Sequence, residues 1–144
     1  MILILLIDAE PALAEELRAA FSQVEGFALV LSSGSEQLPT ELAALRPDVI
    51  LLDSPSALVA DSISIWQHVA PFSRIVVWAR SVSPEFAFKA IRLGVRGVLL
   101  RTASIASVLR CLTKVSEGEI WLDKALFDNV TPTSGLLLHE HPGR

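Results

Sequence analysis

Residues 48–53 read Asp-Val-Ile-Leu-Leu-Asp, an apolar run that ends in a carboxylate. A continuous apolar run of this length is typical of a strand that is covered on both faces of a parallel sheet. Runs of the same character predict five strands in total, over Ile2–Ile7, Phe27–Leu31, Asp48–Leu52, Arg74–Trp78 and Arg96–Leu100. Their first residues lie 21 to 26 positions apart, which is too long for a hairpin but fits a strand, a turn and a helix.

The segments between and after these strands have helical spacing of apolar residues. We expect helices over residues 11–21, 35–45, 57–69, 83–94 and 104–117. Pro11 suits a first helical turn, Ser83 followed by proline suits an N-cap, and Gly94 and Gly118 suit helix ends. Five strand–helix units with right-handed crossovers predict an α/β fold, a doubly wound parallel sheet with helices on both faces.

The composition restricts the class of protein. Hydrophobic residues make up 51% of the 144 residues and charged residues 19%, which predicts a packed core and excludes disorder. The net charge of −4 argues against nucleic-acid binding by this chain alone. A single cysteine, Cys111, excludes an internal disulfide, and the first apolar run stops at Asp8, too short for a signal or membrane segment. We therefore expect a cytoplasmic protein without a membrane segment.

Polar residues follow four of the predicted strands. Asp8 follows the first strand, Asp53 the third, Ala79-Arg80 the fourth and Arg101 the fifth. In an open α/β sheet, the binding crevice lies at the carboxyl ends of the strands, so these side chains are expected to converge. The turn after the first strand has no glycine, which argues against a dinucleotide or P-loop site.

This arrangement resembles the receiver domain of two-component response regulators, in particular those that precede LuxR-type helix-turn-helix transcription factors. The resemblance covers roughly residues 1–118 and rests on ILLIDAEP at 4–11, DVILLD at 48–53 and the stretch GVRGVLLRTASIASVLRCLTKVSEGEIWLD at 94–123. It implies a flavodoxin-like fold with strand order 2-1-3-4-5.

The resemblance implies that Asp53 is the phosphoacceptor. It also implies weak candidate Mg²⁺ ligands, namely Asp8, Asp53 and Pro55, because phosphoryl transfer to a carboxylate needs a hard cation. The second of the family's paired acids falls on Ala9. Glu10 is adjacent, but a shift of one residue is expected to point its side chain elsewhere.

The family's switch positions are altered in this sequence. Ala79 stands where the family has a hydroxyl residue, Val98 where it has an aromatic residue, and Arg101 where it has a lysine. Arginine keeps the charge but presents a planar fork instead of a point charge. The resemblance therefore implies a degenerate site with weak or no aspartyl phosphorylation.

Other interpretations of these residues stay open at this stage. Asp8 and Asp53 can be a buried carboxylate pair whose charge Arg101 compensates, or Arg101 can be a permanent partner of Asp53 that fixes one conformation without phosphate. The domain can also be a phosphorylation-independent scaffold for dimerisation or ligand sensing. A flavodoxin-like cofactor binder is a third alternative, although the phosphate loop it needs is missing.

The resemblance also implies a biological setting. We expect the receiver domain over residues 1–123, a linker or tail over 124–144, and no DNA-binding output domain in this chain. The expected role is signal input for transcriptional control without enzymatic activity. The implied partners are a sensor histidine kinase and a second copy of the chain, paired through the surfaces of the first and last helices.

Overall fold

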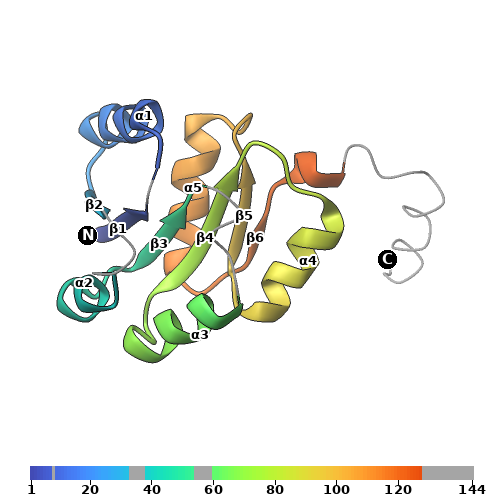
Figure 1. Cartoon of the computed structure of the whole chain (residues 1–144). Helices are drawn as coiled ribbons and strands as arrows, with labels where there is room; N and C mark the ends of the chain where they lie inside the picture. The colour runs from blue at the N-terminus through green and yellow to red at the C-terminus, as the bar shows by residue number, and fades with distance from the viewer. Residues whose placement is uncertain (8, 33–37, 54–59, 128–144) are drawn as a thin grey trace.

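The strands form one parallel sheet with the order β2-β1-β3-β4-β5-β6. The structure is a computed structural model that describes residues 1–7, 9–32, 38–53 and 60–127. The strands are β1 (Ile2–Ile7), β2 (Phe27–Ser32), β3 (Val49–Leu52), β4 (Arg74–Ala79), β5 (Gly97–Leu100) and β6 (Trp121–Leu122). Because all the pairings are parallel, the carboxyl ends of the strands meet at one edge of the sheet, at the tip of the β4 arrow in Figure 1.

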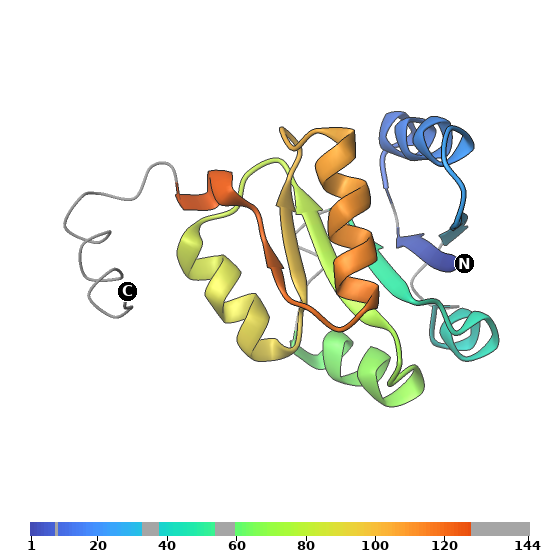
Figure 2. The same ribbon diagram turned by 180° about the vertical axis from the view of Figure 1, so that it is seen from behind.

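Helices cover both faces of this sheet, as the sequence predicts. α1 and α5 pack on one face, and α2, α3 and α4 pack on the other; α5 lies in front of the sheet in Figure 2. Their bounds are α1 (Pro11–Ser22), α2 (Leu38–Leu45), α3 (Ala60–Val69), α4 (Pro84–Leu93) and α5 (Ile105–Ser116). The predicted starts of the second and third helices, at residues 35–37 and 57–59, lie outside the described residues.

Local sequence signals fix the ends of α4 and α5. The Ser83 hydroxyl accepts a hydrogen bond from the Phe86 N–H, and the Ser104 hydroxyl accepts one from the Ser107 N–H. These caps satisfy donors that a helix start otherwise leaves free. Gly94 ends α4 in the left-handed region with φ +115°, where a residue with a Cβ is strained. The predicted capping residues are therefore confirmed at α4.

The core is divided by the sheet because strand side chains alternate. Ile50 and Leu52 of β3 pack against the α2, α3 and α4 side, whereas Val49 and Leu51 pack against α1 and α5. All four are buried, so the strand has no solvent-facing side. Full burial of such a side chain stabilises the fold by about 1.5–3 kcal/mol. This explains why DVILLD is apolar throughout instead of alternating.

The strand order 2-1-3-4-5 is confirmed, but the predicted number of five strands is wrong. β6 adds a sixth parallel strand beside β5, with Gly97 opposite Trp121 and Val98 opposite Leu122. A strand of two residues carries no periodic pattern, so only its pairing partner defines it. A short 3₁₀ helix, η2 (Lys124–Phe127), follows β6, and its Leu126 is buried in the core. The rest of the predicted tail, residues 128–144, lies outside the described residues.

Within the part of the chain that the structure describes, no helix is long and apolar enough to cross a membrane.

Candidate functional site

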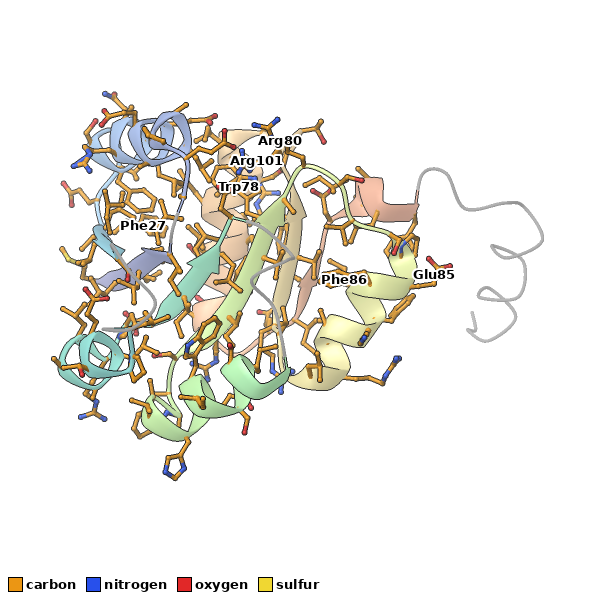
Figure 3. The ribbon with its side chains drawn as sticks, viewed as in Figure 1. Phe27, Trp78, Arg80, Glu85, Phe86 and Arg101 are labelled. Atoms are coloured by element: carbon orange, nitrogen blue, oxygen red, sulfur yellow. The ribbon has the colours of Figure 1, made fainter. Side chains whose placement is uncertain are left out.

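Charged side chains from separate loops gather at the carboxyl edge of the sheet. Glu10 lies between β1 and α1, Asp53 follows β3, Arg80 follows β4, and Arg101 follows β5. Figure 3 shows Arg80 and Arg101 together at this edge, with Trp78 beside them. The convergence predicted for Asp53 and Arg101 is present, and it arises because parallel strands deliver their ends to one place.

Asp53 is engaged through both carboxylate oxygens. Its Oδ2 atom accepts a hydrogen bond of 3.1 Å from the backbone N–H of Glu10. Its Oδ1 atom is buried and forms an ion pair with the Nη2 atom of Arg101. The Asp53 side chain is only 11% exposed, so this pair is screened less than a surface pair. The negative charge of Asp53 is thus compensated by groups of the protein itself.

Arg101 is held in place from several directions. Its backbone N–H donates to the carbonyl of Ala79 at 3.0 Å, which fixes the loop after β5 against the end of β4. Its Nε atom donates to the carbonyl of Trp78 at 3.3 Å, and its Cζ atom lies 5.5 Å from the centre of the Trp78 ring. A guanidinium over an indole face is attracted to the π-electrons of the ring. These contacts keep the guanidinium of Arg101 directed at Asp53.

Glu10 and Arg80 extend the site outward. The Nη2 atom of Arg80 contacts both carboxylate oxygens of Glu10, at 2.9 and 3.0 Å, and Arg101 lies 3.8 Å from the same carboxylate. The Arg80 side chain is 73% exposed, so this outer pair contributes little to stability. The Glu10 side chain is directed to the two arginines, while its backbone N–H reaches Asp53. The sequence did not predict this backbone role, because no side-chain pattern indicates it.

The two other positions that the sequence analysis predicts as altered switch positions, Ala79 and Val98, are buried and apolar. Ala79 and Val98 are 1% and 0% exposed and belong to the core on the α2, α3 and α4 side of the sheet. Neither side chain has a hydrogen-bond donor, so neither can follow a phosphoryl group at Asp53. Trp78 packs in the core on the opposite face, and its indole N–H donates to the Leu100 carbonyl at 3.1 Å.

The described residues do not fit a divalent cation. Two of the predicted ligands, Asp8 and Pro55, lie outside the described residues. Of the carboxylates present at the site, Asp53 is paired with Arg101, and Glu10 is paired with Arg80 and lies near Arg101. Among the described residues, no group of three or more His, Cys, Asp or Glu side chains is placed to hold a metal ion. The guanidinium groups of Arg80 and Arg101 already neutralise the carboxylate charges that a divalent cation would otherwise neutralise.

The fold and strand order are similar to those of the receiver domains of two-component response regulators. A LuxR-family two-component response regulator from Aurantimonas sp. SI85-9A1 matches with a TM-score of 0.77 and 17% identity, over 94% of this chain and 97% of its own. The receiver domain of the putative response regulator NarL from Mycobacterium tuberculosis matches with a TM-score of 0.69 and 20% identity, over 82% of this chain and 98% of its own.

A third similar structure is the isolated receiver domain of RcsB from Salmonella enterica serovar Typhimurium, solved with the phosphomimetic BeF₃⁻. It matches with a TM-score of 0.72 and 17% identity, over 87% of this chain and 95% of its own. No protein-family model matches the sequence, and no curated protein sequence matches it. The comparisons therefore show the receiver fold.

Proposed function

We propose that this chain is the signal-input receiver domain of an atypical two-component response regulator, with weak or no phosphorylation of Asp53. In this proposal the domain is not an enzyme; it controls transcription in the cytoplasm through a DNA-binding output domain. The support for signal input is the receiver fold together with an aspartate at the end of β3. The support for weak phosphorylation is the state of that aspartate.

The ion pair between Asp53 and Arg101 is the observation that carries the proposal. Phosphorylation requires a carboxylate oxygen to approach the phosphorus of a donor while positive charge stabilises the phosphoryl oxygens. Here the Oδ1 atom is buried against Arg101, and the Oδ2 atom accepts the Glu10 N–H. A donor can react only after Arg101 has moved, and that movement separates a largely buried ion pair.

The described residues also provide no good cation site, and this too is expected to weaken phosphorylation of Asp53. Mg²⁺ neutralises charge at a phosphoacceptor when its ligands are carboxylates and carbonyls. Ala9 supplies no such ligand, and Glu10 is already paired with Arg80. The proposal therefore includes at most weak Mg²⁺ binding, with Asp8, Asp53 and Pro55 as the ligands that the sequence predicts.

The proposal includes partners and domain limits typical of the same class of protein. They are a sensor histidine kinase, a second copy of the chain across α1 and α5, and DNA contacted by the output domain alone. RcsB from Salmonella, whose receiver fold is similar, has been solved bound to a promoter, which is a property of that protein. We place the receiver domain at residues 1–123 and the connection to an output domain at 124–144.

The mass of the intact protein after incubation with Mg²⁺ and acetyl phosphate tests the proposal. The wild type is expected to gain little or no phosphoryl mass, and Asp53→Asn supplies the background. A full phosphoryl adduct on the wild type that is absent from Asp53→Asn would show that the ion pair does not close the site. That result would restore ordinary phosphorylation-dependent signalling.

A phosphorylation-independent scaffold is the second candidate, and the same ion pair favours it. A charge pair that is complete without phosphate can fix one conformation permanently. The receiver fold itself does not decide between these roles, because one fold supports many functions. A putative pilus assembly-related protein from Burkholderia pseudomallei also matches this structure, with a TM-score of 0.68 and 19% identity. A dimer that the wild type forms without a phosphodonor, and that acetyl phosphate with Mg²⁺ leaves unchanged in sedimentation, would favour the scaffold.

A further inference from the structure

The segment after α5 turns back along the sheet and packs against it. This segment, residues 121–127, is the C-terminal strap; it runs beside β5 and ends near the start of α4 in Figures 1 and 2. Its backbone pairs with β5 through Trp121 N–H to the Arg96 carbonyl and Asp123 N–H to the Val98 carbonyl, each 2.9 Å. The strap therefore covers an edge of the sheet that would otherwise expose unpaired backbone groups.

Side chains at the end of the strap join it to α4. Leu126 is 4% exposed and belongs to the core on the α2, α3 and α4 side. The Phe127 ring lies 5.9 Å from the Phe88 ring of α4, measured between centroids. The strap thus connects β5, the strand with which it pairs, to α4, a helix that begins beside the carboxyl ends of the strands.

Asp123 fastens the strap. Its Oδ2 atom accepts a hydrogen bond of 2.9 Å from the backbone N–H of Leu100, the last residue of β5. Its Oδ1 atom accepts the Ala125 N–H at 3.0 Å, and its carbonyl accepts the Leu126 N–H at 3.0 Å. One carboxylate therefore caps η2 and holds the end of β5. Hydrogen bonds to an ionised group are stronger than those between neutral groups.

The point where Asp123 is attached borders the Asp53 site. Leu100 directly precedes Arg101, the residue that pairs with Asp53. The carbonyl of Leu100 accepts the indole N–H of Trp78, and the carbonyl of Trp78 accepts the Nε–H of Arg101. Leu100 is therefore hydrogen-bonded to the strap through its N–H and, through its carbonyl, to Trp78, which contacts Arg101.

We propose that the C-terminal strap is the output element of this domain, and that it is docked when Arg101 pairs with Asp53 and released when that pair opens. The inference rests on the proposed function, since it takes the paired site as the resting state. When Arg101 leaves Asp53, the contacts between Arg101 and Trp78 change. Because Trp78 is hydrogen-bonded to Leu100, the position of Leu100 then changes too, and Leu100 is the residue whose N–H binds Asp123. A short segment with few backbone bonds has low local stability, so a small change is enough to release it.

Release of the strap separates residues 121–127 from β5 and α4. The strap is the last described segment, and its docked position is set by its contacts with these two elements. Its release also exposes the edge of β5 and the Phe88 ring. Opening of the Asp53–Arg101 pair is thereby converted into a change in the position of residues 121–127.

Amide hydrogen exchange followed by NMR tests this coupling in the full chain. The reporting amides are Trp121 and Asp123 in the strap, and Leu5 and Ile50 in the central strands serve as internal references. Three variants are compared with the wild type: Arg101→Gln opens the site, Asp123→Asn removes one acceptor from the strap attachment, and Arg80→Gln is the matched control. Among the described residues, the side-chain hydrogen bonds of Arg80 go to Glu10 and not to Trp78 or Leu100.

The expected result is a selective loss of protection in the strap. Compared with the wild type, the strap amides of Arg101→Gln and Asp123→Asn exchange at least about fivefold faster, the lower end of typical coupling between sites. In each variant they still exchange faster than the reference amides, which report global unfolding. Arg80→Gln leaves the strap rates within about twofold of the wild type, because its pair is exposed. Strap rates in Arg101→Gln equal to those of the wild type would overturn the inference. If Arg101→Gln does not fold, Asp53→Asn, which removes the other charge of the pair, is used with the same criteria.

The same proteins separate this inference from the proposed function. If the wild type accepts a phosphoryl group readily, the closed-site proposal fails whatever the strap does. If the wild type resists phosphorylation while the strap amides of Arg101→Gln exchange as in the wild type, the closed site stands and the coupling fails. Strap amides that exchange only as fast as the reference amides of the same variant open by global unfolding alone, and this result also contradicts a selective release.

Discussion

The Arg101 guanidinium lies over the Trp78 indole, with 5.5 Å between its Cζ atom and the ring centre, while its Nε donates to the Trp78 carbonyl. One residue of β4 thus orients the cation that compensates Asp53. Trp78 is buried, so its ring cannot turn aside without disturbing the core on the α1 and α5 face. The rigidity of the closed site comes from this core.

We expect Trp78→Phe to weaken the site and the fold together. The change removes the indole hydrogen bond to the Leu100 carbonyl, which still accepts the Ala103 N–H, and it reduces the attraction on the Arg101 guanidinium. A lost hydrogen bond costs about 0.5–1.5 kcal/mol of the free energy of unfolding, and the space left by the smaller ring adds to this loss. Urea denaturation measures the loss. Trp66→Phe is the matched control, because Trp66 is also buried but does not contact Arg101. A greater phosphoryl uptake in Trp78→Phe than in Trp66→Phe is expected, and equal uptake would contradict a positioning role.

Introducing the residues expected of receiver domains should allow phosphorylation of Asp53. Arg101→Lys replaces a planar fork that lies over Trp78 with a flexible point charge. Ala9→Asp supplies the missing acid. We expect the double variant to gain phosphoryl mass from acetyl phosphate and Mg²⁺, and the same variant with Asp53→Asn to gain none. An inert double variant would show that residues beyond these two positions close the site.

The two arginines of the site should contribute unequally to stability. Arg101→Gln leaves the largely buried carboxylate of Asp53 without its cation, so we expect the free energy of unfolding to fall by about 1–3 kcal/mol. Arg80→Gln removes an exposed pair and should change it by less than about 1 kcal/mol. Urea titrations at low and high salt measure both values. Equal effects, or a larger loss in Arg80→Gln, would show that Asp53 is compensated in another way.

The single thiol should be inert in the folded protein. Burial raises the pKa of Cys111, and the nearby negative charge of Asp123 adds to this rise, so the thiol stays protonated in the folded state. An unfolded thiol ionises near its ordinary pKa of about 8.5, so alkaline pH favours the unfolded chain above that value. We expect a disulfide reagent at pH 8 to react with Cys111 only after urea is added. Rapid reaction with the native protein would show that α5 opens.

Gly97 should not tolerate a side chain. A Cβ at this position meets Val76 Cγ2 at 3.0 Å, Val115 Cγ2 at 3.2 Å and the Cys111 sulfur at 3.4 Å. We expect Gly97→Ala to lower the free energy of unfolding by about 1–3 kcal/mol through overpacking between β5 and α5. Ala106→Ser on the exposed surface of α5 serves as the control for a small substitution. A thermal midpoint for Gly97→Ala equal to that of the control would show that the core has room there.

Much of the architecture follows from local sequence. Apolar runs such as Ile2–Ile7 and residues 48–53 predict buried parallel strands, because only a sheet covered on both faces has no polar side. Pro11 and Gly94 mark helix ends through backbone geometry that depends on the residue itself, and Ser83 does so through its hydroxyl. Since parallel strands end at one edge, the sequence also predicted that Asp53 and Arg101 would meet. The pair between them was one of the interpretations that it left open.

Tertiary structure alone determined which groups contact one another at the carboxyl edge of the sheet. The Glu10 N–H reaches Asp53 across 43 residues, and Asp123 reaches Leu100 across 23. Neither contact can be recognised as a pattern in the sequence. Every residue except proline has a backbone N–H, so the donor at Glu10 is not marked by its residue type, and a single acceptor such as Asp123 forms no repeat. The two-residue β6 exists only through its pairing with β5. The sequence by itself determined which elements form and which residues end the strands. The packed fold determined which partner each charge has, because partners distant in the chain are chosen by three-dimensional proximity.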